Sequence, residues 1–292
     1  HAIRVVDDGV TAWLLVDGSE VTSLYGWLDR MRFLLRVEVS DRTKEFATIG
    51  WFDGTGQREF REQVLGSVAA APNGTPITWR DPWPEVAAGG HQYAEVDEHP
   101  GAGWTWRETL VPREKLGGVA EAVARGELQV AGILAAEALR IAAWRPRLAT
   151  EVDEKLIPHE VDWLRSAVHL NKGCYRGQET VAKVHNLGHP PRRLVMLHLD
   201  GSDSIVPARG DEVVLQDAPE TVVGHVKSSG LHFELGPIAL AIIKRQTPTD
   251  AVLSVVSGGS VIPASQEVIV PPEAGAAVGR VPRLPRLGAS RR

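Results

Sequence analysis

The hydrophobic pattern of this chain changes at residues 188–191, Gly-His-Pro-Pro. On the C-terminal side, short runs of Val, Leu and Ile are separated by turn residues rich in Gly. These runs predict strands at residues 194–199, 212–216, 222–227, 238–243 and 252–256. Short strands at such close spacing are typical of a small antiparallel barrel. The stiff, polar sequence at 188–191 is typical of a domain junction.

Before this junction, segments with the period of a strand alternate with segments with the period of a helix. Two alternating runs, 2–6 and 12–16, flank an Asp-Asp-Gly turn and predict a hairpin. Further strands are predicted at 34–39, 46–52 and 104–111, and helices at 20–32, 58–70, 116–124 and 130–144. This order predicts an α+β fold of antiparallel sheets with packed helices. Residues 71–103, interrupted by five Pro, predict a loop-rich insertion.

The length of 292 residues is enough for two domains. We predict an α+β domain over 1–188, a barrel over 189–270 and a basic, disordered tail over 271–292. The tail carries five Arg and one Glu, so the net charge of −5 leaves residues 1–270 with −9. An acidic body argues against direct binding of nucleic acid, which requires clustered Lys and Arg.

The single cysteine, Cys174, excludes a disulfide within the chain and favours a reducing, cytoplasmic compartment. No run approaches 18 uninterrupted apolar residues, so we expect no membrane span. His185 and His189 have a spacing seen in zinc sites, but Gly188 and Pro190 place them in a turn, and we expect no metal site. The sequence has no glycine-rich dinucleotide motif, no P-loop and no hydrolase nucleophile motif.

One dense group of chemically active residues runs from Lys172 to Glu179 and reads KGCYRGQE. Its two glycines allow close approach of the backbone or a positive φ. The following residues, 180–184, predict a helix, so Cys174 would lie near a helix N-terminus between Lys172 and Arg176, where a thiolate is favoured. A lone cysteine is also commonly a small buried apolar residue, and both interpretations stay open at this point.

The string KGCYRGQE resembles the signature of the YgfZ family of folate-binding proteins, which are related to the glycine-cleavage T-protein. Seven of its eight residues fall at the fixed positions of the family, with Arg176 at the variable one. The upstream segments 132–134, 139–141 and 157–160 resemble the helix and loop that precede this signature. The resemblance extends over most of residues 1–260.

This resemblance implies a T-protein-like folate-binding domain, with an N-terminal part that precedes His1, followed by the small barrel. It implies a monomeric cytoplasmic factor that supports assembly or maintenance of iron–sulfur clusters in client enzymes, including tRNA-modifying enzymes. Its ligand would be tetrahydrofolate or another folate, and its partners the client or assembly proteins. Such a factor is not a conventional enzyme. The alternative is a folate-dependent aminomethyltransferase or another one-carbon transferase.

The same resemblance implies roles for particular residues. Cys174 would be the functional thiol, and Arg140, Lys172 and Arg176 would receive the anionic tail of folate. The other residues implied to shape the site or to contact the ligand are Glu160, Tyr175, Gln178 and Glu179.

Two positions depart from the T-protein pattern. Relatives with transferase activity carry an acidic pair in the first strand, where this chain has His1 and Ala2. Aminomethyl transfer thereby loses its candidate acid/base group. The T-protein pattern also has a pteridine-binding Glu where this chain has Ala142, which cannot accept those hydrogen bonds.

Overall fold

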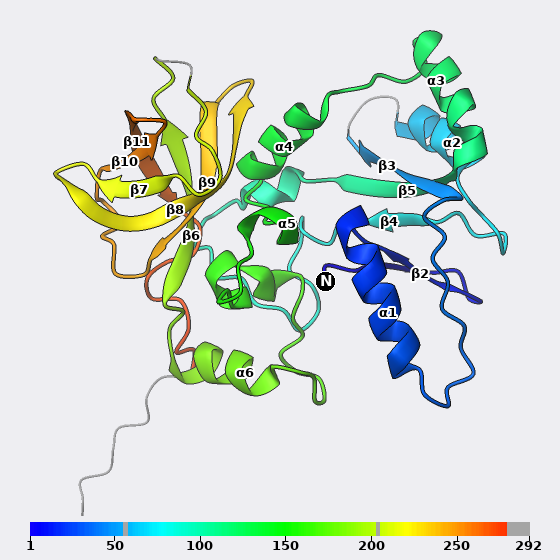
Figure 1. The fold of residues 1–292 in the computed structure, drawn as a ribbon, viewed down its shortest axis with the longest axis horizontal. Helices are drawn as coiled ribbons and strands as arrows, with labels where there is room; N and C mark the ends of the chain where they lie inside the picture. The colour runs from blue at the N-terminus through cyan, green and yellow to red at the C-terminus, as the bar shows by residue number, and fades with distance from the viewer. Residues whose placement is uncertain (55–57, 203–204, 279–292) are drawn as a thin grey trace, which may run out of the picture. The chain divides into compact units, whose positions relative to one another are not determined.

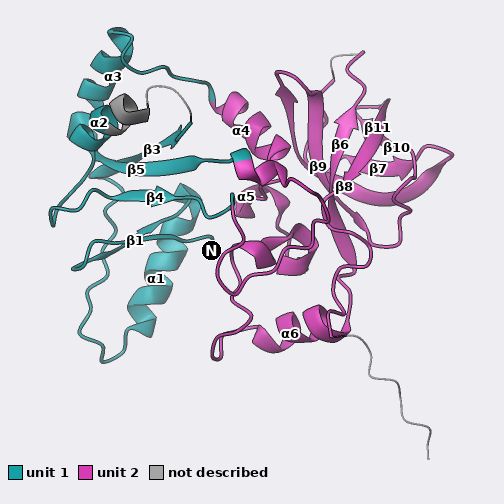
Figure 2. Ribbon diagram, turned by 180° about the vertical axis from the view of Figure 1, so that it is seen from behind, with its two compact units in different colours: residues 1–84, 103–132 teal, residues 85–102, 133–292 magenta. Residues whose placement is uncertain are grey.

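The computed structural model describes residues 1–54, 58–202 and 205–278 (Figure 1). The chain divides into two compact units (Figure 2). Unit 1 comprises residues 1–84 and 103–132, and unit 2 comprises residues 85–102 and 133–292. The chain therefore passes from unit 1 into unit 2, returns, and enters unit 2 again.

Unit 1 begins with the predicted hairpin, formed by β1 (Arg4–Asp7) and β2 (Ala12–Leu15), in which Asp7 pairs with Ala12. The side chain of Asp8 closes the turn, because its Oδ1 accepts hydrogen bonds from the backbone N–H groups of Val10 and Thr11. This is the capping chemistry for which Asp is favoured in turns.

The remaining strands of unit 1 form an antiparallel sheet in the order β3-β5-β4. These strands are β3 (Phe46–Phe52), β4 (Thr78–Arg80) and β5 (Trp106–Pro112). The helical elements are η1 (Gly18–Glu20), α1 (Val21–Met31), α2 (Arg58–Val68), η3 (Arg113–Lys115) and α3 (Leu116–Ala124). A buried cluster of Ala70, Ile77 and Leu110 forms the core and packs against Val6, Trp13 and Phe46.

The strand predicted at 34–39 is wrong: these residues form an extended loop after α1. Phe33, just past the end of the helix, has a φ of 42°, in the left-handed region. Leu34 is 98% exposed, and Leu35 and Val37 are also exposed. A run of apolar residues forms a strand only where a neighbouring strand satisfies its backbone groups, and in the described residues this segment pairs with none.

The tryptophans around the Pro-rich insertion are packed against protein. Trp83 is fully buried, and Trp104 stacks on Trp106 with ring centroids 5.6 Å apart. The indole Nε1 of Trp104 also donates a hydrogen bond to Asp81 Oδ2 at 2.9 Å. These rings therefore contribute to the core of unit 1.

Unit 2 contains the predicted barrel, which is closed and antiparallel in the order β10-β11-β6-β9-β8-β7. Its strands are β6 (Arg192–Leu199), β7 (Glu212–Leu215), β8 (Ala218–His232), β9 (Gly236–Lys244), β10 (Leu253–Ser257) and β11 (Ser260–Val268). Alternate residues of these strands fill the interior. Strand β11 is not predicted from the sequence, because Pro263 and its polar residues obscure the pattern, although its pairing with β6 helps to close the barrel.

The helical elements of unit 2 lie in the two segments that precede the barrel. They are η2 (Pro100–Gly103), α4 (Ile133–Ala142), α5 (Leu148–Glu151), η4 (Pro158–Val161), η5 (Trp163–Arg165) and α6 (Gln178–Leu187). Helix α4 packs closely on β8. The two backbones approach at Gly230, where an added Cβ would lie only 3.3 Å from the Cα of Ala138. Residues 133–188 thus belong to the same compact unit as the barrel, so the units divide the chain differently from the boundary predicted at residue 188.

The start of the predicted tail packs against α6 through residues 275–278. Ala274 is buried, and the N–H of Ala277 donates to the carbonyl of His185 at 2.9 Å. The rest of the predicted tail, 279–292, lies outside the described residues. Within the part of the chain that the structure describes, no helix is both long enough and apolar enough to cross a bilayer.

Candidate functional site in unit 2

The KGCYRGQE segment forms a loop that leads into α6, as its sequence predicts. Gly177 is the residue that starts the helix, with a φ of 86° that favours glycine, and its carbonyl accepts the N–H of Val181. Gly173 has no positive φ, and a Cβ placed there would meet no atom within 4 Å. The first glycine is therefore not required by the local backbone.

The functional groups of this loop face solvent. Cys174 is an exposed free cysteine, which favours an accessible thiol over a buried apolar residue. Lys172 places its Nζ 5.2 Å from the ring centroid of Tyr175, a cation–π contact that ties the two side chains together. Arg176 and Glu179 are exposed, and Gln178 is half-buried.

The loop rests on a piece of the Pro-rich insertion. The N–H of Leu170 donates to the carbonyl of Gly89 at 2.7 Å, and the N–H of His91 donates to the carbonyl of Leu164 at 3.0 Å. The ring of His169 packs so closely on Gly89 that a Cβ there would lie 2.4 Å from it. Residues 87–93 therefore support the segment from which the loop emerges.

Four rings gather on one side of α6, and we call His91, Tyr93, His159 and His185 the histidine–tyrosine cluster. His91 and His185 lie 4.7 Å apart between ring centroids, and His91 and Tyr93 lie 4.9 Å apart. Tyr93 Oη and His185 Nδ1 share a hydrogen bond of 2.9 Å. The Nε2 of His159 hydrogen-bonds to the carbonyl of Val181 at 3.0 Å. Two of the four rings thus hold α6 by direct hydrogen bonds.

Burial keeps this cluster uncharged near neutral pH. Desolvation lowers the pKa of His91, His159 and His185 below the ordinary value of 6.5, and the neighbouring His91 adds to the effect on His185. Burial also raises the pKa of Tyr93 above its ordinary value, with a smaller contribution from Asp162. The rings therefore act as neutral hydrogen-bonding groups.

A cleft of about 270 Å³ lies between this cluster and the C-terminal segment. One wall is made by residues 91–93 and Glu95, and the other by residues of 271–277. The second wall is fastened to α6, since a Cβ on Gly275 would lie 2.3 Å from the carbonyl oxygen of Gly188. His189, one of the two histidines with zinc-like spacing, hydrogen-bonds through Nδ1 to the carbonyl of Ala274. Among the described residues, no group of three potential ligands could hold a metal ion.

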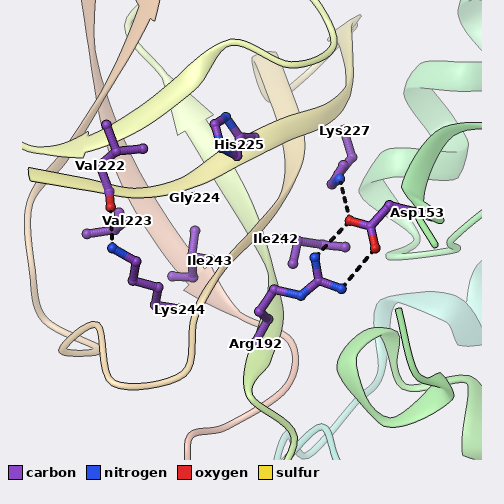
Figure 3. Close-up of a pocket in the computed structure, with 10 residues that line it drawn as sticks. All are labelled: Asp153, Arg192, Val222, Val223, Gly224, His225, Lys227, Ile242, Ile243 and Lys244. Carbon is purple, nitrogen blue, oxygen red and sulfur yellow. Dashed lines mark hydrogen bonds and ion pairs between the residues drawn. The ribbon is translucent and has the colours of Figure 1, made fainter. Parts of the chain in front are cut away.

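Glu160 lies in an ion-pair network whose other members are partly exposed. Its carboxylate is fully buried and accepts hydrogen bonds from Arg192 Nε at 2.9 Å and Nη2 at 2.8 Å. Arg192 also binds Asp153, which in turn accepts from Lys227 Nζ at 3.2 Å (Figure 3). The paired Arg192 lowers the pKa of Asp153, and Glu160 and Asp153 raise that of Arg192. This network joins η4 and the loop before it to the barrel.

Arg140 lies in a second network, on α4. Its guanidinium pairs with Glu137 at 3.0 Å and with the fully buried Glu151 at 3.2 Å, and it donates to the carbonyl of Arg145 at 2.6 Å. Glu151 also accepts from Thr150 Oγ1. The guanidinium of Arg140 is therefore occupied by the protein itself.

The predicted residues thus fall into three groups. Cys174 lies in one exposed loop and helix start with Lys172, Tyr175, Arg176, Gln178 and Glu179, whereas Glu160 and Arg140 belong to the two separate ion-pair networks. His91 and Tyr93 are not predicted from the sequence, because the Pro-rich insertion has no periodicity that would mark them.

Comparison with known proteins bears on the fold. No family model matches the chain, and no curated protein matches it. Among solved structures, it is similar to the glycine cleavage system aminomethyltransferase T from Bartonella henselae, with a TM-score of 0.59 over 86% of this chain. The fold is T-protein-like. The two sequences are 15% identical, so the likeness concerns the fold alone, and this chain covers 66% of the length of that protein.

Within this T-protein-like fold, the loop at 172–177 is exposed apart from the half-buried Tyr175. It presents a thiol, two cationic side chains and the N-terminus of α6 to solvent. The histidine–tyrosine cluster lies on one side of α6 and is hydrogen-bonded to it through Tyr93 and His159.

Proposed function

We propose that this chain is a folate-binding factor of the YgfZ type that supports assembly or maintenance of iron–sulfur clusters in client enzymes, including tRNA-modifying enzymes. The observation that carries this proposal is the KGCYRGQE loop, with Cys174 exposed at the start of α6. The T-protein-like fold supports it. In this proposal the protein acts in the cytoplasm as a monomer, on partner proteins and without direct contact to nucleic acid.

The residues present fit one end of a folate. Lys172 and Arg176 are exposed, and in the described part of the chain neither pairs with a carboxylate, so both are free to bind the carboxylates of the glutamate tail. Arg140 is occupied by Glu137 and Glu151, and Ala142 offers no acceptor to the pteridine. We therefore assign tail recognition to the loop. A bound tetrahydrofolate would supply a carrier for one-carbon units.

In this proposal, Cys174 is the residue that contacts an iron–sulfur cluster or a cysteine of the partner protein. Thiolates are soft ligands and the usual protein ligands of iron–sulfur clusters. One exposed cysteine cannot supply the four ligands of a cluster, so the thiol would act on a cluster or a cysteine held by a partner. An exposed loop anchored at both ends is suited to that contact.

Rescue of a deletion strain tests the thiol. The wild-type chain is expected to restore the activity of an iron–sulfur enzyme, and Cys174→Ala is expected to abolish this rescue at equal protein level. Lys183→Ala, at an exposed position of α6, is the matched control and should rescue fully. Full rescue by Cys174→Ala would contradict the proposal.

Calorimetry with tetrahydrofolate and the whole chain tests the ligand separately. We expect saturable binding that weakens when Lys172 and Arg176 are both changed to Met and persists in Cys174→Ala. Absence of binding to the wild-type chain would remove folate from the proposal while leaving the thiol test in place.

The second candidate is a folate-dependent aminomethyltransferase, which the likeness to aminomethyltransferase T favours. The acidic pair of active relatives is replaced here by His1 and Ala2. In unit 1, however, His1 Nδ1 lies 2.8 Å from Glu20 Oε1, so a carboxylate lies beside that position. A coupled assay with tetrahydrofolate and an aminomethyl donor distinguishes the transferase from the cluster-assembly factor. Turnover that is lost in Glu20→Gln would favour the transferase over the factor.

A further inference from the structure

A cavity of about 390 Å³ opens on the outer face of the barrel wall formed by β6, β8 and β9 (Figure 3). Ala241 and Ile243 belong to the barrel interior, so the alternating residues Ile242 and Lys244 face outward. The volume falls in the range of roughly 300–1,000 Å³ that small-molecule sites occupy. None of the residues assigned to the loop of Cys174 lines it.

Two of the cations at this cavity are offset by carboxylates. Arg192 uses its donors on Glu160 and on Asp153, and Lys227 donates to Asp153 at 3.2 Å. Two positive and two negative charges therefore balance. Lys227 still has two N–H donors beyond the one that binds Asp153, and 14% of its side chain is exposed.

Lys244 adds a positive charge that no carboxylate offsets. Its Nζ donates to the carbonyl of Val222 at 2.7 Å, and within the described residues it takes part in no ion pair. This contact orders the long side chain at the cavity rim (Figure 3) and leaves two N–H donors for a ligand. His225, whose Nδ1 hydrogen-bonds to the carbonyl of Gly210, adds a further polar ring.

The rest of the lining is apolar. Ile242 lines the cavity but is only 3% exposed, and Val223 belongs to the barrel interior, so Val222 offers the accessible apolar surface. A site with an apolar wall and a few fixed polar groups suits a ligand with an anionic end and a carbon skeleton.

We propose that this cavity binds a small organic anion, a carboxylate or a phosphate ester, whose charged group contacts Lys244 and whose carbon skeleton packs on Val222 (Figure 3). The surplus positive charge at the rim attracts the anion, although residues 1–270 carry −9 overall. This site is independent of the function proposed above.

Calorimetry with the whole chain tests this proposal, with benzoate, phenyl phosphate and inorganic phosphate as probes. Benzoate and phenyl phosphate separate the two ligand classes, and inorganic phosphate, which lacks the carbon skeleton, should bind more weakly than phenyl phosphate. We expect Lys244→Met to weaken the better probe by about tenfold, the effect of losing one charge-assisted hydrogen bond. Lys244→Arg keeps the charge and should retain binding.

Lys183→Met, on exposed α6, is the matched control and should change the affinity by less than about twofold. The melting temperature of each variant establishes that it is folded. The proposal is overturned if no probe binds saturably at concentrations up to about 10 mM, or if Lys244→Met and Lys183→Met bind equally well.

Discussion

Replacing Asp162 by asparagine should change how the stability of this protein depends on pH. Asp162 is fully buried between η4 and η5, in the left-handed region with φ 55° and ψ 25°. Its Oδ1 accepts the backbone N–H of Tyr93 at 2.7 Å. Burial raises its pKa from 3.8 to about 7, and the N–H of Tyr93 and the charge of Arg165 oppose part of this rise.

The sign follows from the proton affinities of the two states. The folded state holds the proton of Asp162 more tightly than the unfolded state, so the stabilisation is complete below pH 3.8 and is lost as the pH rises through 7. At about 1.36 kcal/mol for each pKa unit, the whole shift amounts to roughly 4 kcal/mol. The part lost between pH 5 and pH 8 is about 2.5 kcal/mol.

Buried histidines contribute with the opposite sign. Burial lowers the pKa of His99 to about 4 and also lowers that of His159, so both stabilise the folded state above pH 6.5 and cease to do so as the pH falls. The pH profile of the wild-type protein therefore mixes both effects. The difference between Asp162→Asn and wild type isolates Asp162, because asparagine keeps Oδ1 and tolerates left-handed backbone.

Guanidinium unfolding followed by circular dichroism at pH 5, 6, 7 and 8 measures this difference. The free energy of unfolding of Asp162→Asn, relative to wild type, should rise by about 2.5 kcal/mol from pH 5 to pH 8. Asp97→Asn, an exposed position on the same inserted segment, is the control and should give a flat difference. A flat or falling difference for Asp162→Asn would refute the reasoning.

Three further substitutions test the packing around the candidate site by chemical denaturation. Glu160→Gln removes the fully buried carboxylate but leaves Asp153 to pair the partly exposed Arg192, so it should cost about 1–3 kcal/mol, and unchanged stability would contradict the role given to Glu160. Tyr93→Phe removes the hydrogen bond to His185 and should cost about 1 kcal/mol, an expectation that unchanged stability would refute. Gly275→Ala forces a side chain into a backbone with a φ of 94° and should cost at least about 1–2 kcal/mol, so a neutral result would show that the segment does not pack on α6.

Local sequence patterns predicted most elements of this fold, because hydrophobic period and turn residues act over short distances. The strand at 46–52 and the helix at 116–124 were predicted with the bounds that the structure has. The prediction of a strand at 34–39 was wrong, because a strand requires a neighbouring strand to pair with, and the local sequence does not encode that partner. The reverse error occurred at β11, where cross-strand pairing with β6 outweighs a poor local pattern.

For the candidate site, too, the local features were predicted from the sequence and the long-range contacts were not. The motif at 172–179 predicted a loop that leads into a helix, and the structure adds that its cysteine is exposed and that Gly177 has the positive φ. For Arg140, the sequence suggested a contact with an anionic ligand, whereas the structure pairs it with Glu137 and Glu151. Residue type alone does not distinguish a cation available to a ligand from one already paired within the protein.

The α+β part, five of the six barrel strands and the loop that carries the thiol can be predicted from the sequence, since each follows from neighbouring residues. The bond of Tyr93 to His185 and the pairing of Arg192 with Glu160 depend on how the chain packs, as does the lack of a carboxylate partner for Lys244 among the described residues. These contacts join residues that lie far apart in the chain, so they produce no periodic pattern in the sequence. Their partners are fixed only when packing brings the segments together and excludes water from the groups between them.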